Sequence, residues 1–168
     1  PNGSTCVVQA NANTLRSFLY NRQVEQFLSR AVEEDLFEVY YQPIYSIRKK
    51  RFVTLEALSR LRHPELGWIS PDVFIRLAEK NRLIDALTDL QLRRVCRFLK
   101  SHEAVARQID SVKVNLSALN LMQEHCAERL IAILDEYALP HRLFQFEITE
   151  TVATEYSSRL SRAVDAFS

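Results

Sequence analysis

The sequence predicts an α/β fold, in which helices pack against a mainly parallel sheet. From residue 37 onward, stretches typical of β-strands alternate with amphipathic stretches typical of helices. The connection at residues 46–51 is too short to hold a crossover helix, so the first two strands should pair antiparallel. Polar residues end three successive strands, which is where α/β proteins place their functional sites.

Composition narrows the class of protein. The chain has 168 residues, which is the size of one domain, and 47% of them are hydrophobic, which is enough for a core. The net charge of +1 argues against a broad nucleic-acid-binding surface, so we expect no DNA partner. The chain has no apolar stretch of roughly eighteen residues and no signal-peptide pattern at its N-terminus. We therefore expect no membrane span and a cytoplasmic location.

The usage of cysteine, histidine and glycine argues against several kinds of site. Cys6, Cys96 and Cys126 are far apart and form no C-x-x-C pair, which favours core packing in a reducing compartment over metal or redox work. The four histidines lack H-E-x-x-H spacing, and no serine stands in a G-x-S-x-G motif. With only two glycines, the chain cannot form a glycine-rich phosphate-binding loop.

The chain divides into three parts. Residues 1–13 are small and polar and are interpreted as a leader or linker. Residues 14–34 carry apolar side chains at spacings of three and four, which predicts an amphipathic helix. This helix could dock on its own domain, couple the domain to an upstream module, or form a dimer seam, and docking is slightly favoured. Residues 35–168 form the α/β part.

Local patterns predict the elements of the α/β part. Aromatic and β-branched residues predict strands at 37–44, 52–58, 112–117 and 144–148, with Pro43 closing the first. Ser70 and Pro71 suit the start of a helix, and apolar periodicity predicts further helices at 83–101, at 118–137 and from about residue 156.

Three polar residues stand at the ends of successive strands. They are Glu56, Asn115 and Glu147, and they offer oxygen only. Two carboxylates and a carboxamide favour Mg²⁺, Mn²⁺ or Ca²⁺ over zinc. Taken one at a time, the same residues also suit helix capping or a salt bridge at a strand end. A carboxylate in an apolar strand such as the one ending at Glu56 usually has a reason, because an unpaired interior charge is costly.

Four ordered motifs resemble one known family. They are Tyr41-Gln42-Pro43-Ile44; Glu56-Ala57-Leu58 with Arg60, His63-Pro64, Gly67 and Pro71; Val114-Asn115-Leu116-Ser117; and Phe146-Glu147-Ile148-Thr149-Glu150. In this order and spacing they resemble the EAL domain, a family of bacterial phosphodiesterases that hydrolyse cyclic di-GMP in second-messenger signalling. The resemblance covers residues 31–168.

The resemblance implies a modified TIM-type barrel whose first strand is antiparallel. It implies that Glu56, Asn115 and Glu147 bind a pair of Mg²⁺ or Mn²⁺ ions, with Ca²⁺ as an inhibitory substitute. Residues expected to contact the dinucleotide are Gln42, Leu58, Arg60 and Pro71. Glu56 and Glu150 would be the catalytic carboxylates, with Glu150 bracing a loop that carries another metal ligand. The product would be the linear dinucleotide.

The chain departs from the family pattern in its length. The Asp-Asp-Phe-Gly motif and the later Lys, Glu and Gln of the pattern are absent. The part from residue 37 is about half of the roughly 250 residues of a complete barrel. We therefore expect the chain alone to be inactive, with two unpaired strand edges and an open sheet face. A homodimer, or a longer parent chain, would cover them.

Two further expectations follow from this comparison with the family. The alternative function is a non-catalytic EAL relative that binds cyclic di-GMP or a protein partner as a regulator, and a third possibility is an inactive fragment. The loop at residues 48–51 and the position of Asn81 lack glycines that the resemblance would lead one to expect. Because Asn tolerates the left-handed conformation, Asn81 is expected to accommodate it.

Overall fold

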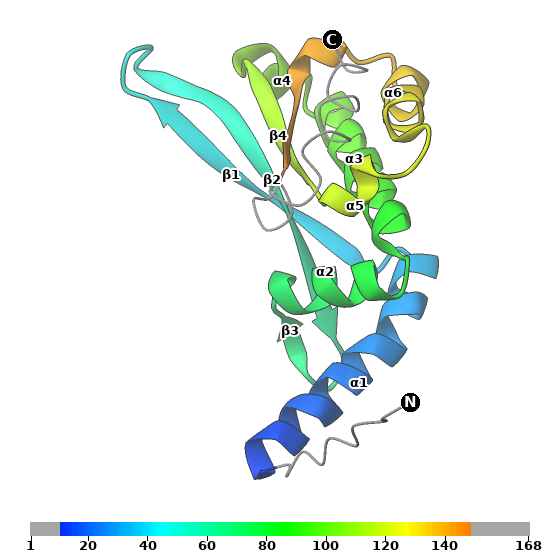
Figure 1. The fold of residues 1–168 in the computed structure, drawn as a ribbon. Helices are drawn as coiled ribbons and strands as arrows, with labels where there is room; N and C mark the ends of the chain where they lie inside the picture. The colour runs from blue at the N-terminus through cyan, green and yellow to red at the C-terminus, as the bar shows by residue number, and fades with distance from the viewer. Residues whose placement is uncertain (1–10, 149–168) are drawn as a thin grey trace.

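The computed structural model describes residues 11–148, which form one mixed sheet with helices against it (Figure 1). The strands are β1 (Phe37–Ser46), β2 (Arg51–His63), β3 (Gly67–Ile69), β4 (Ser111–Leu116) and β5 (Phe144–Ile148). Their order is β1-β2-β4-β5, and the short β3 pairs with β2. The pair β1/β2 is antiparallel, whereas β2/β4 and β4/β5 are parallel. The predicted hairpin followed by parallel strands is confirmed.

The first two strands are longer than the sequence suggested. Strand β1 continues through Pro43, which pairs in register with Leu55. A proline is tolerated there because β1 has only one strand neighbour among residues 11–148, so its missing N–H need not serve a second partner. Strand β2 runs on to His63 and turns through Gly67, whose φ of 72° suits glycine, into β3. The segment between β2 and α2 therefore contains a short strand.

Six α-helices accompany the sheet in the described part of the chain. They are α1 (Ala12–Glu33), α2 (Pro71–Lys80), α3 (Ile84–Ser101), α4 (Glu103–Gln108), α5 (Ala118–Leu121) and α6 (Cys126–Glu136), with a 3₁₀ turn η1 (His141–Leu143) before β5. The prediction of a single helix at 118–137 is wrong. The helix is interrupted between α5 and α6, because His125 has a φ of 64° and cannot continue a right-handed helix.

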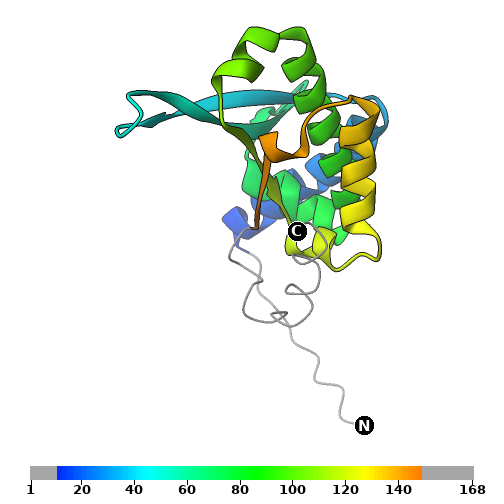
Figure 2. The ribbon, with the colours of Figure 1, turned by 90° about the horizontal axis from the view of Figure 1, so that it is seen from above.

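The core lies on one face of the sheet. Alternate residues of β4, namely Val112, Val114 and Leu116, are buried in a cluster with side chains of α3 and α6. Figure 2, which looks from above, shows α3, α5 and α6 on the same side of the strands. The opposite face, in the described structure, has no helix packed on it. This open face is the one that the resemblance assigns to a barrel interior.

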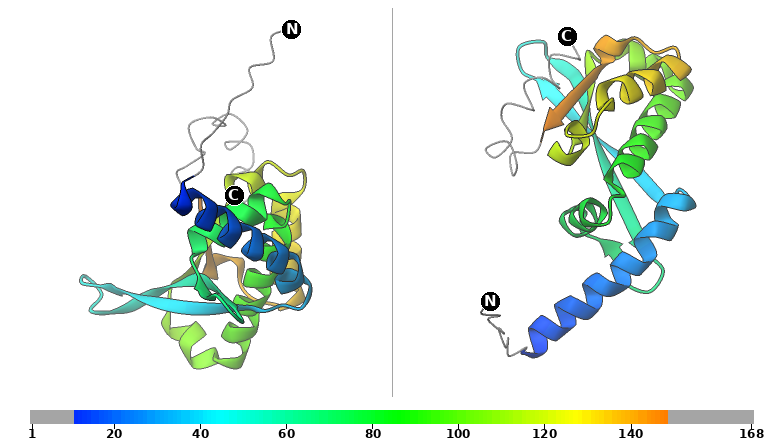
Figure 3. Two further views of the ribbon diagram at one scale, coloured as in Figure 1. Left: turned by 90° about the horizontal axis from the view of Figure 1, so that it is seen from below. Right: turned by 45° about the vertical axis from the view of Figure 1, so that its right-hand side comes forward.

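A second cluster joins α1 and α2 to the far end of β2. The second half of α1 buries Val24 and Leu28 completely in this cluster. The first half projects beyond it, as Figure 3 shows, and leaves Phe18 59% exposed. Docking is thus observed for the second half of the helix, and a coupling role for the first half stays a prediction. Within residues 11–148, no helix is both long and apolar enough to cross a membrane.

Two of the three cysteines lie in the described part, and both are core residues. Cys96 and Cys126 are buried and form no disulfide. Burial raises the pKa of the Cys96 thiol to about 12, which keeps it protonated and unreactive. Cys6 lies outside the described residues.

The residues that adopt a left-handed backbone conformation are not the ones expected from the sequence. Asn81 has a φ of −96°, while its neighbour Arg82 has a φ of 59°. In the β1–β2 turn, Lys50 has a φ of 50°. The Asn81 expectation is therefore wrong by one residue, and two basic side chains occupy conformations that favour glycine.

Candidate metal and nucleotide site

Glu56 and Asn115 lie on the neighbouring strands β2 and β4. The parallel register sets Glu56 opposite Lys113, which is two residues before Asn115. Side chains two residues apart on a strand point to the same face, so all three lie on the open face of the sheet. The Asn115 Nδ2 atom donates a hydrogen bond of 3.4 Å to Glu56 Oε1.

Strand β5 adds the third predicted ligand, Glu147. It is paired in register with Asn115 and therefore also lies on the open face. Its carboxylate forms an ion pair with the Lys113 ammonium, and both side chains keep partial exposure, 42% for Glu147 and 29% for Lys113. The three predicted ligands thus share one face of three adjacent strands, and their ligand role stays a prediction.

Glu56 does not stand at the end of its strand, contrary to the sequence interpretation. Strand β2 continues to His63, where it pairs with β1 and β3. The pairing of β2 with β4, however, stops at Ala57. Glu56 therefore lies near the carboxyl end of the parallel part of β2, one residue before its pairing with β4 stops.

The donor chemistry of these residues fits a hard divalent cation. Two carboxylates and one amide oxygen are ligands that Mg²⁺ and Mn²⁺ accept. Across residues 11–148, no group of three or more His, Cys, Asp or Glu side chains is placed to hold a metal. The set of Glu56, Asn115 and Glu147 contains only two acids, and the Lys113 ammonium already neutralises one of them.

A cavity of about 130 Å³ adjoins Asn115 at the carboxyl end of the sheet. Three of the predicted nucleotide contacts, Leu58, Arg60 and Pro71, line it together with Asn115. The Arg60 guanidinium donates to the Ser59 carbonyl oxygen at 2.9 Å and lies 5.8 Å from the centre of the Tyr40 ring.

The fourth predicted contact, Gln42, lies on β1, level with the metal residues. It pairs in register with Glu56 and shares the open face, but it does not line the cavity. Arg60 forms no ion pair with any acid among residues 11–148, which leaves its charge available for an anion.

The sequence interpretation missed a buried polar network behind Asn115. Asn120 is completely buried, and its side chain accepts from the Ser117 N–H at 3.0 Å and donates to Asp85 at 2.7 Å. The Ser117 hydroxyl donates to Glu79 at 2.5 Å. The Ser117 side chain also caps α5, because it accepts a hydrogen bond from Leu119 N. The Ser-x-x-Asn spacing after the strand was the available signal for this network.

The network continues into α6 through Arg129. This guanidinium pairs with Asp85 at 2.9 Å and also with Asp89. Burial raises the pKa of the Asp89 carboxyl even though Arg129 acts against it. The turn that carries Asn115 into α5 is therefore tied to three helices.

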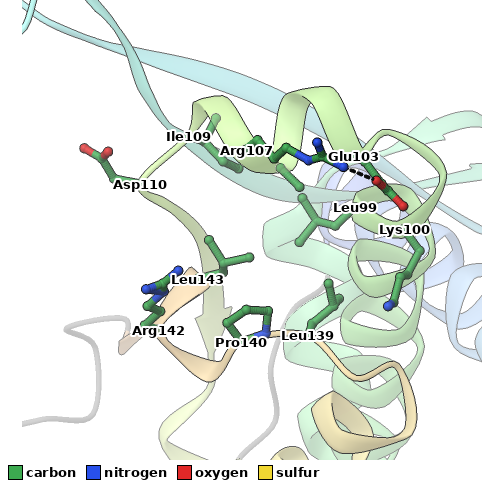
Figure 4. Close-up of a pocket in the computed structure, with 11 residues that line it drawn as sticks. Leu99, Lys100, Glu103, Arg107, Ile109, Asp110, Leu139, Pro140, Arg142 and Leu143 are labelled. Carbon is green, nitrogen blue, oxygen red and sulfur yellow. Dashed lines mark hydrogen bonds and ion pairs between the residues drawn. The ribbon is translucent and has the colours of Figure 1, made fainter.

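A larger cavity than the one beside Asn115 lies at the opposite end of the sheet, away from the predicted site, and Figure 4 shows its lining. It has a volume of about 670 Å³ and lies between the end of α3, α4 and the segment before β5. Arg107 and Glu103 pair across one wall at 2.6 Å, and Leu99, Ile109 and Leu143 supply apolar lining. None of the predicted site residues lines this cavity.

The predicted catalytic residue Glu150 lies outside the described residues, as does the helix expected near residue 156.

The fold and the site together define a class of protein. Parallel strands joined by helices, with acidic residues at the carboxyl edge, are features of a TIM-type barrel, here represented by its first part. The antiparallel first strand makes it a modified barrel. The chain belongs to the EAL domain family, whose model matches residues 25–168.

Curated relatives and solved structures agree with this assignment. Two relatives from Pseudomonas aeruginosa are the cyclic di-GMP phosphodiesterase NbdA, 38% identical over 76% of this chain, and the cyclic di-GMP phosphodiesterase PA2567, 34% identical over 74%. The chain spans only 16% and 21% of their lengths.

Two solved EAL structures are similar to the described fold. A complex of the PaMucR phosphodiesterase with c-di-GMP has a TM-score of 0.74 and 26% sequence identity to this chain. The match covers 86% of this chain and 60% of the PaMucR chain. The FimX EAL domain has a TM-score of 0.74 and 25% identity, and it covers 85% of this chain and 57% of its own. The implied barrel family is thus confirmed, with only part of the barrel present.

Proposed function

We propose that this chain is the N-terminal part of a cyclic di-GMP phosphodiesterase domain. The observation that supports it best is the row of Glu56, Asn115 and Glu147 on one face, beside a cavity lined by Arg60. The proposal includes a bacterial, cytoplasmic setting, as in second-messenger signalling, and the relatives named above are bacterial.

Each residue has a role in this proposal. Arg60 binds a phosphate of the dinucleotide, Leu58 and Pro71 contact its apolar surfaces, and Gln42 hydrogen-bonds to it. Glu56, Asn115 and Glu147 hold Mg²⁺ or Mn²⁺ and keep the phosphodiester next to the carboxyl edge, and Ca²⁺ binds there without supporting hydrolysis.

When bound, such a pair of metal ions would activate water and stabilise the leaving oxygen, giving the linear dinucleotide. Glu150 would brace the loop that carries the next metal ligand. The chain by itself does not complete the reaction, because the aspartates and the lysine of the later motifs are not in it.

A second candidate function is a non-catalytic EAL relative that binds cyclic di-GMP or a protein partner as a regulator. The observation that favours it is the Lys113–Glu147 ion pair, which neutralises one of the two carboxylates without a metal. In either function the partner is a second copy of the chain or the remainder of a longer parent.

Calorimetric titration tests the proposal. We expect cyclic di-GMP to bind in the presence of Ca²⁺ and to bind more weakly in EDTA. In Glu56→Ala, the affinity with Ca²⁺ should fall to the affinity measured in EDTA, because the metal-dependent contribution to binding is lost. A matched control is Glu65→Ala, an exposed carboxylate in the turn before β3. The regulator function predicts equal binding with Ca²⁺ and with EDTA. Absence of binding in both conditions would contradict the phosphodiesterase proposal and the nucleotide-binding regulator for this chain, and would leave an inactive fragment or a regulator that binds a protein partner.

A further inference from the structure

Lys113 lies in the middle of the proposed metal site. It is level with Glu56 on one neighbouring strand, it forms an ion pair with Glu147 of the other, and it precedes Asn115 by two residues on its own strand. Its side chain is only 29% exposed. A lysine held between two carboxylates on the open face is a fixed positive charge at the place where a cation would bind.

The ion pair affects what a metal ion can do at Glu147. A divalent cation that coordinates this carboxylate must either displace the ammonium or sit a few ångströms from it. Displacement leaves a half-buried ammonium without its partner, and coexistence places two positive charges side by side. Both consequences weaken metal binding relative to a site with a neutral residue at position 113.

The same pair also keeps the site intact without a metal. Glu56 and Glu147, on the two strands that flank β4, repel each other, and a lysine on β4 between them offsets that repulsion. Arg60 does not serve this purpose, because its guanidinium contacts the Ser59 carbonyl and the Tyr40 ring instead. Lys113 therefore has the geometry of an internal counter-ion.

We infer that Lys113 competes with the metal for Glu147. The Lys113 ammonium pairs with this carboxylate in the free protein and thereby sets how tightly the site binds divalent cations. This inference rests on the proposed function, since it concerns the same three ligands. A pair that served stability alone would leave metal affinity unchanged when Lys113 is replaced.

The test is calorimetric titration of Mn²⁺ into the whole chain, without nucleotide. Lys113→Met keeps the length and the apolar stem of the side chain and removes the charge, so we expect Mn²⁺ to bind about tenfold more tightly than to the wild type. Lys113→Arg keeps the charge and should stay near the wild-type affinity. Lys100→Met makes the same change of net charge in the cavity at the other end of the sheet and should also stay near wild type.

A second variant shows whether the gain passes through Glu147. Combining Lys113→Met with Glu147→Gln should abolish the gain, and a gain that survives in the double variant would overturn the inference. Thermal melts in EDTA establish that each variant is folded, and Mn²⁺ should raise the Tm of Lys113→Met more than that of the wild type.

The outcomes separate this inference from the proposed function. Equal Mn²⁺ affinity in the wild type and in folded Lys113→Met overturns the role of Lys113 but leaves the metal site standing. Absence of Mn²⁺ binding in both proteins overturns the inference together with the metal part of the proposed function. Cyclic di-GMP binding, measured separately, then decides whether the nucleotide part survives.

Discussion

At the scale of single residues, the Asn120 side chain joins three partners behind the candidate site. Its side chain accepts hydrogen bonds from the Ser117 backbone N–H and the Thr88 hydroxyl and donates one to the Asp85 carboxylate. It has no exposed surface. Because it joins α3 to the turn after β4, it holds the backbone that presents Asn115. The position of Asn115 thus depends on a residue that contacts no ligand.

Asn120→Ala should destabilise the protein by about 2 kcal/mol, because it leaves buried partners unsatisfied. Urea unfolding followed by circular dichroism measures the change in the free energy of unfolding. Asn81→Ala is the matched control, since its amide contacts Leu77 O and Glu25 near the surface, and it should cost about 0.5 kcal/mol. Equal losses in the two variants would contradict the structural role of Asn120.

The site residues also show what could be read from the sequence at this scale. Glu56, Asn115 and Glu147 were predictable because each is a polar residue in or after an apolar strand. Lys113 was not singled out, because a lysine in an alternating strand looks like an ordinary solvent-facing residue. Only its register opposite Glu56 and its ion pair with Glu147 show that it lies between acids.

At the scale of elements, the β1–β2 ribbon is the most exposed part of the sheet. Its turn end projects beyond the helices in Figure 3, and Ile47 in the turn is 85% exposed. The left-handed conformation of Lys50 strains the turn, and ion pairs from Lys49 in the turn and Arg51 at the start of β2 tie it to Asp110.

Lys50→Gly should stabilise the protein by about 0.5–1 kcal/mol, because glycine relieves the cost of a positive φ. Thermal unfolding measures it as an increase in Tm. Arg48→Gly is the control in the same turn: its φ is not positive, so the added freedom of the unfolded chain should make it neutral or destabilising. A lower Tm for Lys50→Gly would refute this account of the turn.

Asp110 should give the hairpin a pH dependence. Lys49 at 2.7 Å and Arg51 at 2.5 Å hold the pKa of Asp110 below its usual value. A lowered folded pKa contributes stability that is present above the unfolded pKa of about 3.9 and is lost as the pH falls through the folded pKa. Asp110→Asn should therefore unfold at lower urea than the wild type at pH 7.

The difference should shrink in acid, because the wild type loses the Asp110 charge below the folded pKa of that carboxyl, whereas the variant has no charge there to lose. Glu65→Gln, which changes an exposed acid without an ion pair among residues 11–148, should follow the wild type at both pH values. A difference between Asp110→Asn and the wild type that is independent of pH would argue against the ion pairs as its cause.

The elements were predicted well where the pattern was strong. The antiparallel hairpin followed from a connection too short for a helix, and the parallel strands followed from the alternation of strands and helices. The break between α5 and α6 was missed because apolar spacing continued across it, and α4 is too short to show a period. β3 was missed because its pairing with β2 is tertiary information.

At the scale of the whole molecule, the described sheet is an open part of a barrel. Strands β1 and β5 are its edges within residues 11–148, and one face carries the site without a covering helix. Unpaired edges and an open face favour association. The sequence predicted this form because the family motifs stop early in the barrel, whereas no local pattern could say what covers the open face.

The isolated chain should therefore associate. Light scattering at micromolar concentration should give twice the 19.5 kDa mass of one chain. Adding a charge at the edge, as in Ile44→Lys on β1, should shift the mass toward that of one chain, while Ile47→Lys in the turn should leave it unchanged. A compact monomer at all concentrations would rule out pairing of two copies and leave the longer parent as the partner.

The most direct test of the account is nuclear magnetic resonance of the ¹⁵N-labelled chain during addition of Mn²⁺, whose paramagnetism broadens nearby signals. We expect the side-chain amide of Asn115 and the backbone amides of Lys113 and Glu147 to broaden first, while the amides of α4 at the other end of the sheet stay sharp. Broadening that begins at α4, or that spreads evenly over exposed acids, would contradict a metal site at the carboxyl edge of β2, β4 and β5.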